Sequence, residues 1–323
     1  MALLFVTRKI PEAGIMMLRD AGHEVDISEK DGVLEKSELC DAVASKPYEG
    51  IVSLLTDTID AEVLEAAPHV RIIANYAVGF DNIDVGAANE RAVTVTNTPG
   101  VLTSTVAEYT IALMLTVVKR IAEADRFTRA GKYVGWAPEL FLGEDLYGKT
   151  LGIVGAGRIG KEVAMRAKHG FSMNILYTDI QRSEALEQEV DCTYAEDTER
   201  VLSESDVVSL HLPYNKSTHH LINADLLSLM KPSAFLINTS RGAVIDEEAL
   251  AVALTQKQFA GAGIDVYEHE PAITPELLQL DNVVLTPHIA SASHGTRQKM
   301  SEIAAKNIID FFEGVEPKNV VRK

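Results

Sequence analysis

The sequence has little cysteine and no long apolar run. Its two cysteines, Cys40 and Cys192, lie far apart and do not make a disulfide framework, which favours a reducing compartment, the cytoplasm. After the N-terminal residues, the longest apolar stretch runs from Tyr109 to Val118, whereas a helix that spans a bilayer needs about 20 residues. The apolar start from Met1 to Val6 is cut short by Arg8 and lacks the cleavage site of a signal peptide, so we expect a first strand there.

Basic residues are also scarce. The chain has 30 lysines and arginines against 47 aspartates and glutamates, which gives a formal net charge of −17. Nucleic acids and anionic membranes need a cationic surface, so this balance argues against both as partners. The 323 residues, with 46% hydrophobic and 24% charged side chains, are typical of a globular protein with room for two domains.

Short apolar runs alternate with helical patterns along most of the chain, which is typical of parallel sheets built from βαβ units. The first block predicts strands at 3–7, 24–28, 50–54, 70–75 and 93–96, with helices from Pro11 to Gly22 and at 35–44 and 60–66. The second block predicts strands at 151–154, 174–177, 207–212, 234–238, 261–266 and 283–285, with a helix at 159–169.

Two further helices are predicted around this second block. The helix at 103–119 is apolar around most of its surface, which is typical of a helix buried between layers or at an interface. The helix at 296–312 has an amphipathic pattern and is the last element that the sequence predicts.

A glycine-rich turn follows the apolar run at 151–154. Gly155, Gly157 and Gly160 have the spacing that binds a dinucleotide pyrophosphate. The first glycine permits a tight turn, the second lets the backbone approach the phosphates, and the third allows close packing of helix on strand. The helix that follows the turn has Arg158 and Ile159 at its N-terminus. Its first amides can donate hydrogen bonds to the pyrophosphate, and the positive end of its dipole attracts that negative charge. About 150 residues precede this turn, so we expect them to form a separate domain.

Asp179 lies at the end of the next predicted strand, about 20 residues after Gly160, where an acidic side chain can bind the adenosine ribose hydroxyls. A carboxylate at this point repels a 2′-phosphate, which favours NAD(H) over NADP(H). Arg182 is three residues further on and could instead pair with that phosphate.

Three polar residues follow predicted strands of the second block. Arg241 can bind a carboxylate or polarise a carbonyl, and His288 can donate or accept a proton near neutral pH. Glu270 can hold that imidazole in one tautomer and favour its protonated form. Because ligands of open α/β sheets bind at the carboxyl ends of strands, we expect these side chains to converge on the cofactor.

Over essentially its whole length, the sequence carries long motifs in a fixed order, at residues 75–84, 96–103, 148–155, 230–232, 237–242, 263–267 and 286–290. In these motifs it resembles the D-isomer-specific 2-hydroxyacid dehydrogenases. Within that family, Trp136, Pro138 and residues 141–143 are similar to the glyoxylate/hydroxypyruvate reductase branch. Phosphoglycerate dehydrogenases usually have arginine at the position of Pro138, and phosphite dehydrogenases usually have lysine in the loop at 76–79, where this chain has none.

The resemblance implies two doubly wound parallel-sheet domains. A flavodoxin-like substrate domain would comprise residues 1–99 plus 288–323, and a Rossmann nucleotide-binding domain would comprise residues 100–287. It also implies hydride transfer between a nicotinamide cofactor and C2 of a small 2-oxo or 2-hydroxy acid, most simply the reduction of glyoxylate or hydroxypyruvate. The segment at about 100–145 would form the arm of a homodimer.

The resemblance also implies roles for individual residues. Arg241 would bind the substrate carboxylate and 2-oxo oxygen, His288 would be the acid/base catalyst, and Glu270 would pair with it. The substrate would further contact Leu55 and the amides of Val78 and Gly79. The cofactor would contact, besides the glycine turn and Asp179, the residues Thr103, His211, Pro213, Thr218, Thr239, Ser240 and Asp265.

Three side chains allow a second interpretation. Trp136 either packs in a core, as most tryptophans do, or reaches the substrate pocket of the partner subunit. His211 and Thr218 could equally serve as ordinary loop caps. Two adjacent histidines, His219 and His220, resemble a metal-binding pair, but neighbouring side chains diverge, so we interpret them as a solvated turn and expect no metal.

Two alternatives to glyoxylate or hydroxypyruvate reduction remain open from the sequence. The chain could act on another D-2-hydroxyacid or on phosphite. Some members of this fold family are NADH-sensing corepressors that bind partner proteins and keep the same three polar residues. The pocket loop around Trp136 favours an enzyme over such a binding protein.

Overall fold

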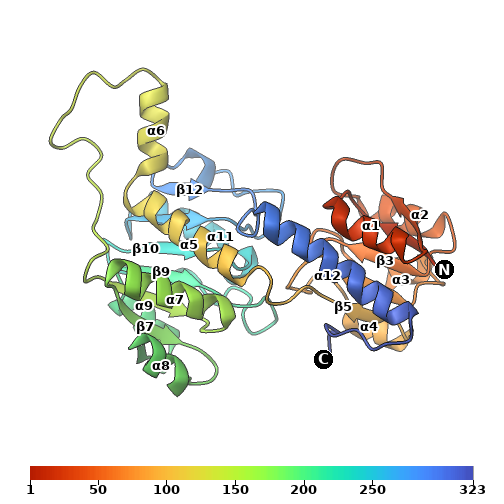
Figure 1. The fold of residues 1–323 in the computed structure, drawn as a ribbon. Helices are drawn as coiled ribbons and strands as arrows, with labels where there is room; N and C mark the ends of the chain where they lie inside the picture. Colours follow the sequence, from red (N-terminus) through yellow and green to blue (C-terminus); the bar gives the residue numbers. More distant parts are fainter. Residues whose placement is uncertain (323) are drawn as a thin grey trace. The chain divides into compact units, whose positions relative to one another are not determined.

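The computed structural model describes residues 1–322. The chain divides into two compact units, one comprising Met1–Leu102 and the segment from Ala292 onward, the other comprising Thr103–Ser291. Each unit contains its own parallel sheet with helices on both faces, and Figure 1 labels these elements.

The first unit is built on a five-stranded parallel sheet. Its strand order is β2-β1-β3-β4-β5, which is the flavodoxin-like order that the resemblance implies. The strands are β1 (Leu3–Val6), β2 (Glu24–Ile27), β3 (Gly50–Ser53), β4 (Ile72–Asn75) and β5 (Thr94–Thr96). Every residue of β3 and β4 is buried, as expected for central strands that are covered on both faces.

Five helices cover this sheet: α1 (Glu12–Asp20), α2 (Lys36–Ala44), α3 (Ala61–Ala66), α4 (Val85–Glu90) and α12 (His294–Phe312). The last of them packs against both α1 and β4, so it buries more of its surface than an amphipathic pattern implies. The contact with α1 is close because Gly14 has no side chain. A Cβ at Gly14 would lie 2.3 Å from the carbonyl oxygen of Ser301.

The second unit is built on a seven-stranded parallel sheet of order β12-β11-β10-β9-β6-β7-β8. Numbered from its first strand, this is the Rossmann order with one strand added at an edge, so the predicted fold class is confirmed for both units. The strands are β6 (Thr150–Val154), β7 (Asn174–Thr178), β8 (Thr193–Tyr194), β9 (Val207–Leu210), β10 (Phe235–Asn238), β11 (Gly261–Ile264) and β12 (Val283–Leu285).

Each face of this sheet has its own apolar core. Ile237 and its neighbours point to the face covered by α5 (Thr103–Val118) and α7 (Arg158–Phe171). Leu236 and its neighbours point to the face covered by α9 (Thr198–Glu204), α10 (Ala224–Leu227) and α11 (Glu247–Thr255). Burying each such side chain contributes about 1.5–3 kcal/mol, so both faces stabilise the sheet.

The strands and helices that the sequence predicts agree with the structure to within two residues at each end. Missing from the prediction are the strand β8 and the helices α4, α6 (Ile121–Arg129), α8 (Glu184–Val190) and α9 to α11. Five of these helices begin with an Asp, Ser or Asn side chain that caps the first turn, and they are only four to nine residues long. Within residues 1–322, no helix is long and apolar enough to cross a membrane.

The helix α6 and the loop after it extend away from the sheet of the second unit (Figure 1). All nine residues of α6 are exposed or half-buried. Trp136, in the following loop, is 83% exposed, so the interpretation of this side chain as part of a core is wrong. The loop carries further exposed apolar side chains at Tyr133, Val134, Leu142 and Tyr147.

Candidate active site

The residues with predicted chemical roles in the second unit lie at the carboxyl edge of its sheet. Each follows the end of a different strand, and the strands are neighbours. In sheet order from β12 to β7, these residues are His288, Asp265, Arg241, His211, Gly155 and Asp179. This edge is where ligands of doubly wound sheets bind.

The glycine turn has the backbone geometry that its sequence predicts. Gly155 has φ of +94°, a left-handed conformation that side chains disfavour. A Cβ at Gly160 would lie 2.1 Å from the carbonyl oxygen of Gly155, so only glycine allows α7 to pack so close. Gly157 is the N-cap residue of α7, and a Cβ placed there would meet open space. The first turn of α7 can therefore be approached by a ligand.

Asp179 lies directly after β7 and contacts the glycine turn. Its Oδ2 accepts a hydrogen bond from the amide of Ala156 at 2.7 Å, and the amide of Gly155 donates to Thr178 O at 2.9 Å. These bonds fix the carboxylate beside the turn. The predicted ribose acid and the predicted phosphate loop thus form one local structure, although 23 residues separate Ala156 from Asp179.

His288 and Glu270 form a direct pair. His288 Nδ1 lies 2.8 Å from Glu270 Oε2 and 3.1 Å from Oε1. A carboxylate can only accept, so Nδ1 carries a proton and Nε2 is the ring atom left to exchange one. Burial raises the pKa of Glu270. The hydrogen bond from His288 and the charge of His288 lower this pKa, and the Tyr267 amide and the Arg241 guanidinium lower it further. The pKa of Glu270 therefore lies below its usual value. Glu270 is therefore ionised at neutral pH.

Asp265 holds the backbone around His288. The carboxylate of Asp265 is fully buried and accepts hydrogen bonds from Thr286 Oγ1 at 2.7 Å and from the amides of Ile289 and Ala290 at 3.0 and 2.8 Å. Its carbonyl accepts the His288 amide at 2.8 Å. His288 has φ of +54°, a left-handed conformation that costs about 1–3 kcal/mol in a non-glycine residue, so it needs such support.

Burial also raises the pKa of Asp265, an effect that these hydrogen bonds partly offset. The resemblance implies that Asp265 contacts the cofactor, but the position of His288 depends on the side chain of Asp265 as well. This second role was missed because the donors lie more than 20 residues away.

Arg241 follows β10 and is half-buried. Its Nη1 donates to Ser240 O at 2.8 Å, and its own carbonyl accepts from Asn238 Nδ2 at 2.9 Å. Asn238 Oδ1 also accepts from the amide and the hydroxyl of Ser240. The turn that presents Arg241 is thus fixed from both sides by one buried asparagine at the end of the strand.

The remaining predicted cofactor residues make contacts within the second unit. Thr239 Oγ1 lies 2.8 Å from Thr110 Oγ1, and Thr103 is the first residue of α5. Burial lowers the pKa of His211 to about 3, so this imidazole stays neutral, with Nε2 2.9 Å from Ser209 Oγ. Thr218 Oγ1 donates to Pro213 O at 2.7 Å. This contact is the one expected if Thr218 caps the loop, the second interpretation given for it above.

The two adjacent histidines differ from each other. His219 is exposed, as a solvated turn requires, but His220 Nε2 lies 2.7 Å from Glu268 Oε1. His220 lies in the same turn with 34% of its side chain exposed, and its contact with Glu268 could not be predicted because 48 residues separate the two. In the part of the chain that the structure describes, no cluster of three or more His, Cys, Asp or Glu residues could hold a metal ion.

In the first unit, the predicted substrate residues lie on two loops that follow adjacent strands. Leu55 comes after β3, and Val78 and Gly79 come after β4. Asn82 links these loops. Its Nδ2 donates to Leu54 O and to Asp57 O, each at 3.0 Å, and its Oδ1 accepts from Asn75 Nδ2 at 3.1 Å.

Asn75 and Asp57 extend this network. The Nδ2 of Asn75 also donates to Gly79 O at 2.9 Å. Asp57 is buried, and its Oδ2 accepts from the Leu54 amide at 2.7 Å and from Thr7 Oγ1 at 2.5 Å. The sequence reasoning missed these three residues. The signal that could have found them is their place: Asn75 is the last residue of β4, and Asp57 and Asn82 lie in the loops that follow β3 and β4.

Asn82→Asp should destabilise the first unit. The substitution keeps the shape but removes two donors and places a carboxylate against two carbonyl oxygens, so we expect a loss of about 1–3 kcal/mol in the free energy of unfolding. Urea unfolding followed by circular dichroism measures this loss. The matched control is Asn89→Asp on the exposed end of α4. Equal stability of the two variants would contradict the linking role of Asn82.

Comparison with known proteins agrees with this geometry. The family model of the D-isomer specific 2-hydroxyacid dehydrogenase, NAD binding domain, matches residues 111–290. The glyoxylate reductase of Korarchaeum cryptofilum is 51% identical over 323 residues, which cover 99% of this chain and 96% of that protein.

Solved structures are similar over the same length. A protein of Thermus thermophilus has a TM-score of 0.92 and 42% identity, over 99% of this chain and 100% of that one. The NADPH-dependent glyoxylate/hydroxypyruvate reductase of Sinorhizobium meliloti, solved with NADP and malonate, has a TM-score of 0.85 and 34% identity, over 99% and 96%. These matches confirm the resemblance stated from the motifs: the chain belongs to the D-isomer-specific 2-hydroxyacid dehydrogenase family.

Proposed function

We propose that this chain reduces a small 2-oxo acid to the D-2-hydroxy acid, with glyoxylate or hydroxypyruvate as its substrate. The observation that carries the proposal is the His288–Glu270 pair, at 2.8 Å, on the same sheet edge as Arg241 and the glycine turn. The choice of substrate is supported by the names of relatives, among them glyoxylate reductases of Korarchaeum cryptofilum and Thermococcus litoralis.

In the mechanism we propose, His288 supplies a proton from Nε2 to the oxygen on C2 as that oxygen gains charge. Arg241 stabilises the same oxygen and binds the carboxylate, because its guanidinium is always charged and presents several donors. Glu270 holds the ring and stabilises the imidazolium before the proton leaves. A bound dihydronicotinamide would supply the hydride that reduces C2. The 2-oxo acid thus gains one hydride and one proton and becomes the 2-hydroxy acid.

We assign the two units different tasks. The first would be the substrate domain, with the amides of Val78 and Gly79 binding the substrate carboxylate and Leu55 contacting the rest of the molecule. The second would be the nucleotide-binding domain, with the pyrophosphate at the amides of Gly157, Arg158 and Ile159. The open space at Gly157 and the close packing at Gly160 support this assignment, since a dinucleotide needs the helix N-terminus to be accessible.

We further propose NAD(H) as the preferred cofactor. Asp179 is fixed beside the glycine turn by the Ala156 amide, where its charge would face the adenosine ribose. Ribose hydroxyls can donate to a carboxylate, whereas a 2′-phosphate is repelled by it. We place this reaction in the cytoplasm, because both cysteines are free thiols, and cell fractionation would test this placement.

Activity with a substrate panel tests the proposed function. Oxidation of NADH and NADPH is followed at 340 nm with glyoxylate, hydroxypyruvate, pyruvate and phenylpyruvate. We expect the highest kcat/KM with glyoxylate or hydroxypyruvate and NADH. Turnover of none of the four acids, with cofactor binding intact, would contradict the enzyme and favour an NADH-sensing binding protein.

His288→Asn should lower kcat for 2-oxo acid reduction by about 100-fold or more, because general acid catalysis contributes about 10²–10⁴-fold. NADH affinity, measured by fluorescence titration, should stay within twofold of the parent protein. The matched control, His69→Asn, changes an exposed histidine of the first unit and should keep full activity.

The pH profile gives an independent measurement of the same role. Reduction should slow as pH rises, because a neutral imidazole has no proton at Nε2 to give. In His288→Asn the residual rate should lose this dependence. A parent profile that is flat from pH 6 to 10 would remove His288 from the role of proton donor.

We also propose that the segment at about 100–145 forms a homodimer with a second copy of this chain. Ile121, Ala124 and Phe127 fall on one side of α6, yet each is exposed or half-buried, and Trp136 is 83% exposed. Covering such apolar surface is the physical reason for association. Whether Trp136 also touches substrate depends on that partner.

Sedimentation velocity tests the dimer. The parent protein should sediment as a dimer, and Trp136→Ser together with Ile121→Ser should shift it toward the monomer. The paired control, Val252→Ser, changes an exposed apolar side chain on α11, 52% exposed, and should leave the assembly intact. A monomeric parent protein at micromolar concentration would refute the proposal.

A further inference from the structure

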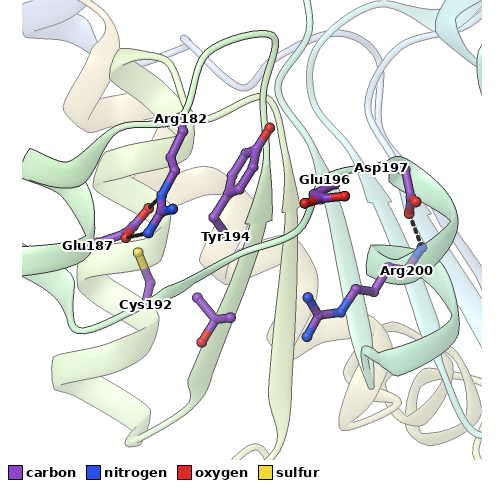
Figure 2. Close-up of a pocket in the computed structure, with 8 residues that line it drawn as sticks. Arg182, Glu187, Cys192, Tyr194, Glu196, Asp197 and Arg200 are labelled. Atoms are coloured by element: carbon purple, nitrogen blue, oxygen red, sulfur yellow. Dashed lines mark hydrogen bonds and ion pairs between the residues drawn. The ribbon is translucent and has the colours of Figure 1, made fainter.

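A second feature of the nucleotide-binding unit lies beside Asp179. A cavity of about 410 Å³ opens where β7 and β8 end, and Figure 2 shows the side chains that line it. Arg182, Glu187 and Tyr194 form one side of this cavity, and Arg200 extends toward it from α9 on the other. The cation nearest to Asp179 in the sequence, Arg182, is therefore part of this wall.

Glu187 binds the guanidinium of Arg182 with both carboxylate oxygens. Arg182 Nε donates to Oε1 and Nη2 donates to Oε2, each at 2.8 Å, as Figure 2 shows. Such a two-point contact is stronger and more directional than a single ion pair. Arg182 also stacks on Tyr194, with its central carbon 5.8 Å from the ring centroid. The side chain is thus held in one place by two different elements.

A second side chain, Tyr177, fixes the carboxylate of Glu187. Its Oε1 accepts a hydrogen bond from the hydroxyl of the buried Tyr177 at 2.8 Å, and only 18% of its side chain is exposed. The contacts with Arg182 and Tyr177 lower the pKa of Glu187 to about 2, so it is ionised at neutral pH. The carboxylate of Glu187 therefore stays charged and bound to Arg182 at neutral pH.

Arg182 is three residues from Asp179, and Tyr194 connects the two regions. The hydroxyl of Tyr194 lies 3.5 Å from the carbonyl oxygen of Asp179. An arginine near this acid is the usual way to accommodate the 2′-phosphate of NADP. Here that arginine is already neutralised. Asp179, Glu187 and Arg182 together carry a charge of −1, to which a phosphate would add further negative charge.

We propose that Glu187 is a specificity-determining residue for the cofactor: by binding Arg182 at two points, it withholds that guanidinium from a 2′-phosphate and so favours NAD(H). This inference rests on the proposed function as a nicotinamide-dependent reductase. Glu187 acts through Arg182 and does not touch the cofactor, so it is a positioning residue. In the sequence alone, Asp179 favours NAD(H), whereas Arg182 could bind the 2′-phosphate of NADP(H). By binding Arg182, Glu187 leaves Asp179 as the residue that determines the preference.

Glu187→Gln tests the proposal. Glutamine has the size of glutamate and can still accept from Tyr177, but it cannot bind a guanidinium through two charged oxygens. We expect the Kd for NADPH, measured by fluorescence titration, to fall at least tenfold, while the Kd for NADH changes less than twofold. The kcat/KM ratio with glyoxylate should shift toward NADPH by a similar factor.

Three further variants make the result specific. Glu189→Gln removes the same charge from the same helix, where it pairs with Lys161, and should leave the ratio of affinities unchanged. Arg182→Gln alone should also change little, because its guanidinium is already occupied. The double variant Glu187→Gln with Arg182→Gln should lose the gain in NADPH affinity. If Glu187→Gln does not fold, Glu187→Asp, whose shorter side chain weakens the two-point contact, replaces it.

The outcomes are distinct. An unchanged NADPH affinity in folded Glu187→Gln, or a gain that persists in the double variant, would overturn the role of Glu187 and leave the proposed function intact. An equal gain in Glu189→Gln would show a general charge effect and overturn it as well. Failure of the parent protein to bind either cofactor would overturn the proposed function, and this inference with it.

Discussion

The parallel pairing of the strands is the constraint on which the candidate site depends. In a parallel sheet all carboxyl ends lie at one edge, so residues that follow different strands become neighbours although the sequence keeps them far apart. In the second unit this brings the loops of Gly155, Arg241 and His288 to one edge, across 133 residues of sequence. The same constraint in the first unit brings the loops of Leu55 and Gly79 side by side, after β3 and β4.

Buried and half-buried polar side chains then fix the loops that this edge carries. Asp265 binds the backbone around His288, Asn238 binds the turn of Arg241, and Asn82 links the two loops of the first unit. A buried carboxylate or amide is costly unless its hydrogen bonds are satisfied, and it is these bonds that make the position of each loop specific. The side chains that we propose take part in the reaction are thus oriented by polar groups to which we assign no step of that reaction.

Charge is used differently at the two ends of the edge. At the end with His288, the ionised Glu270 pairs with the half-buried imidazole that we propose exchanges a proton. At the end with Asp179, Glu187 neutralises Arg182 and leaves the region proposed for the adenosine ribose acidic. The net charge of −17 does not bear on either choice, because local contacts at about 3 Å outweigh distant, screened charges. The family relationship indicates the reaction class, while we propose that such contacts set the preference for one cofactor.

The sequence by itself determined the features that depend on neighbouring residues. The glycine turn, the apolar strands and the two long helices, α5 and α12, follow from local spacing, and their bounds agree with the structure to within two residues. Short capped helices such as α10 carry too little periodicity to be recognised. The polar residues Arg241, Glu270 and His288 were found because each follows a strand and a parallel sheet makes strand ends converge.

Tertiary structure alone decided the rest, because the partners are remote in sequence. The bonds from the backbone after His288 to Asp265 span 24 and 25 positions, those from Asn82 to the loop after β3 span 25 and 28, and the contact between His220 and Glu268 spans 48. Trp136 shows the opposite case: its apolar character predicts burial, but no neighbouring element of its own unit covers it in the described structure. Spacing along the chain determines which residue types stand at strand ends. Only the packing of the sheet determines which charged group each of them meets.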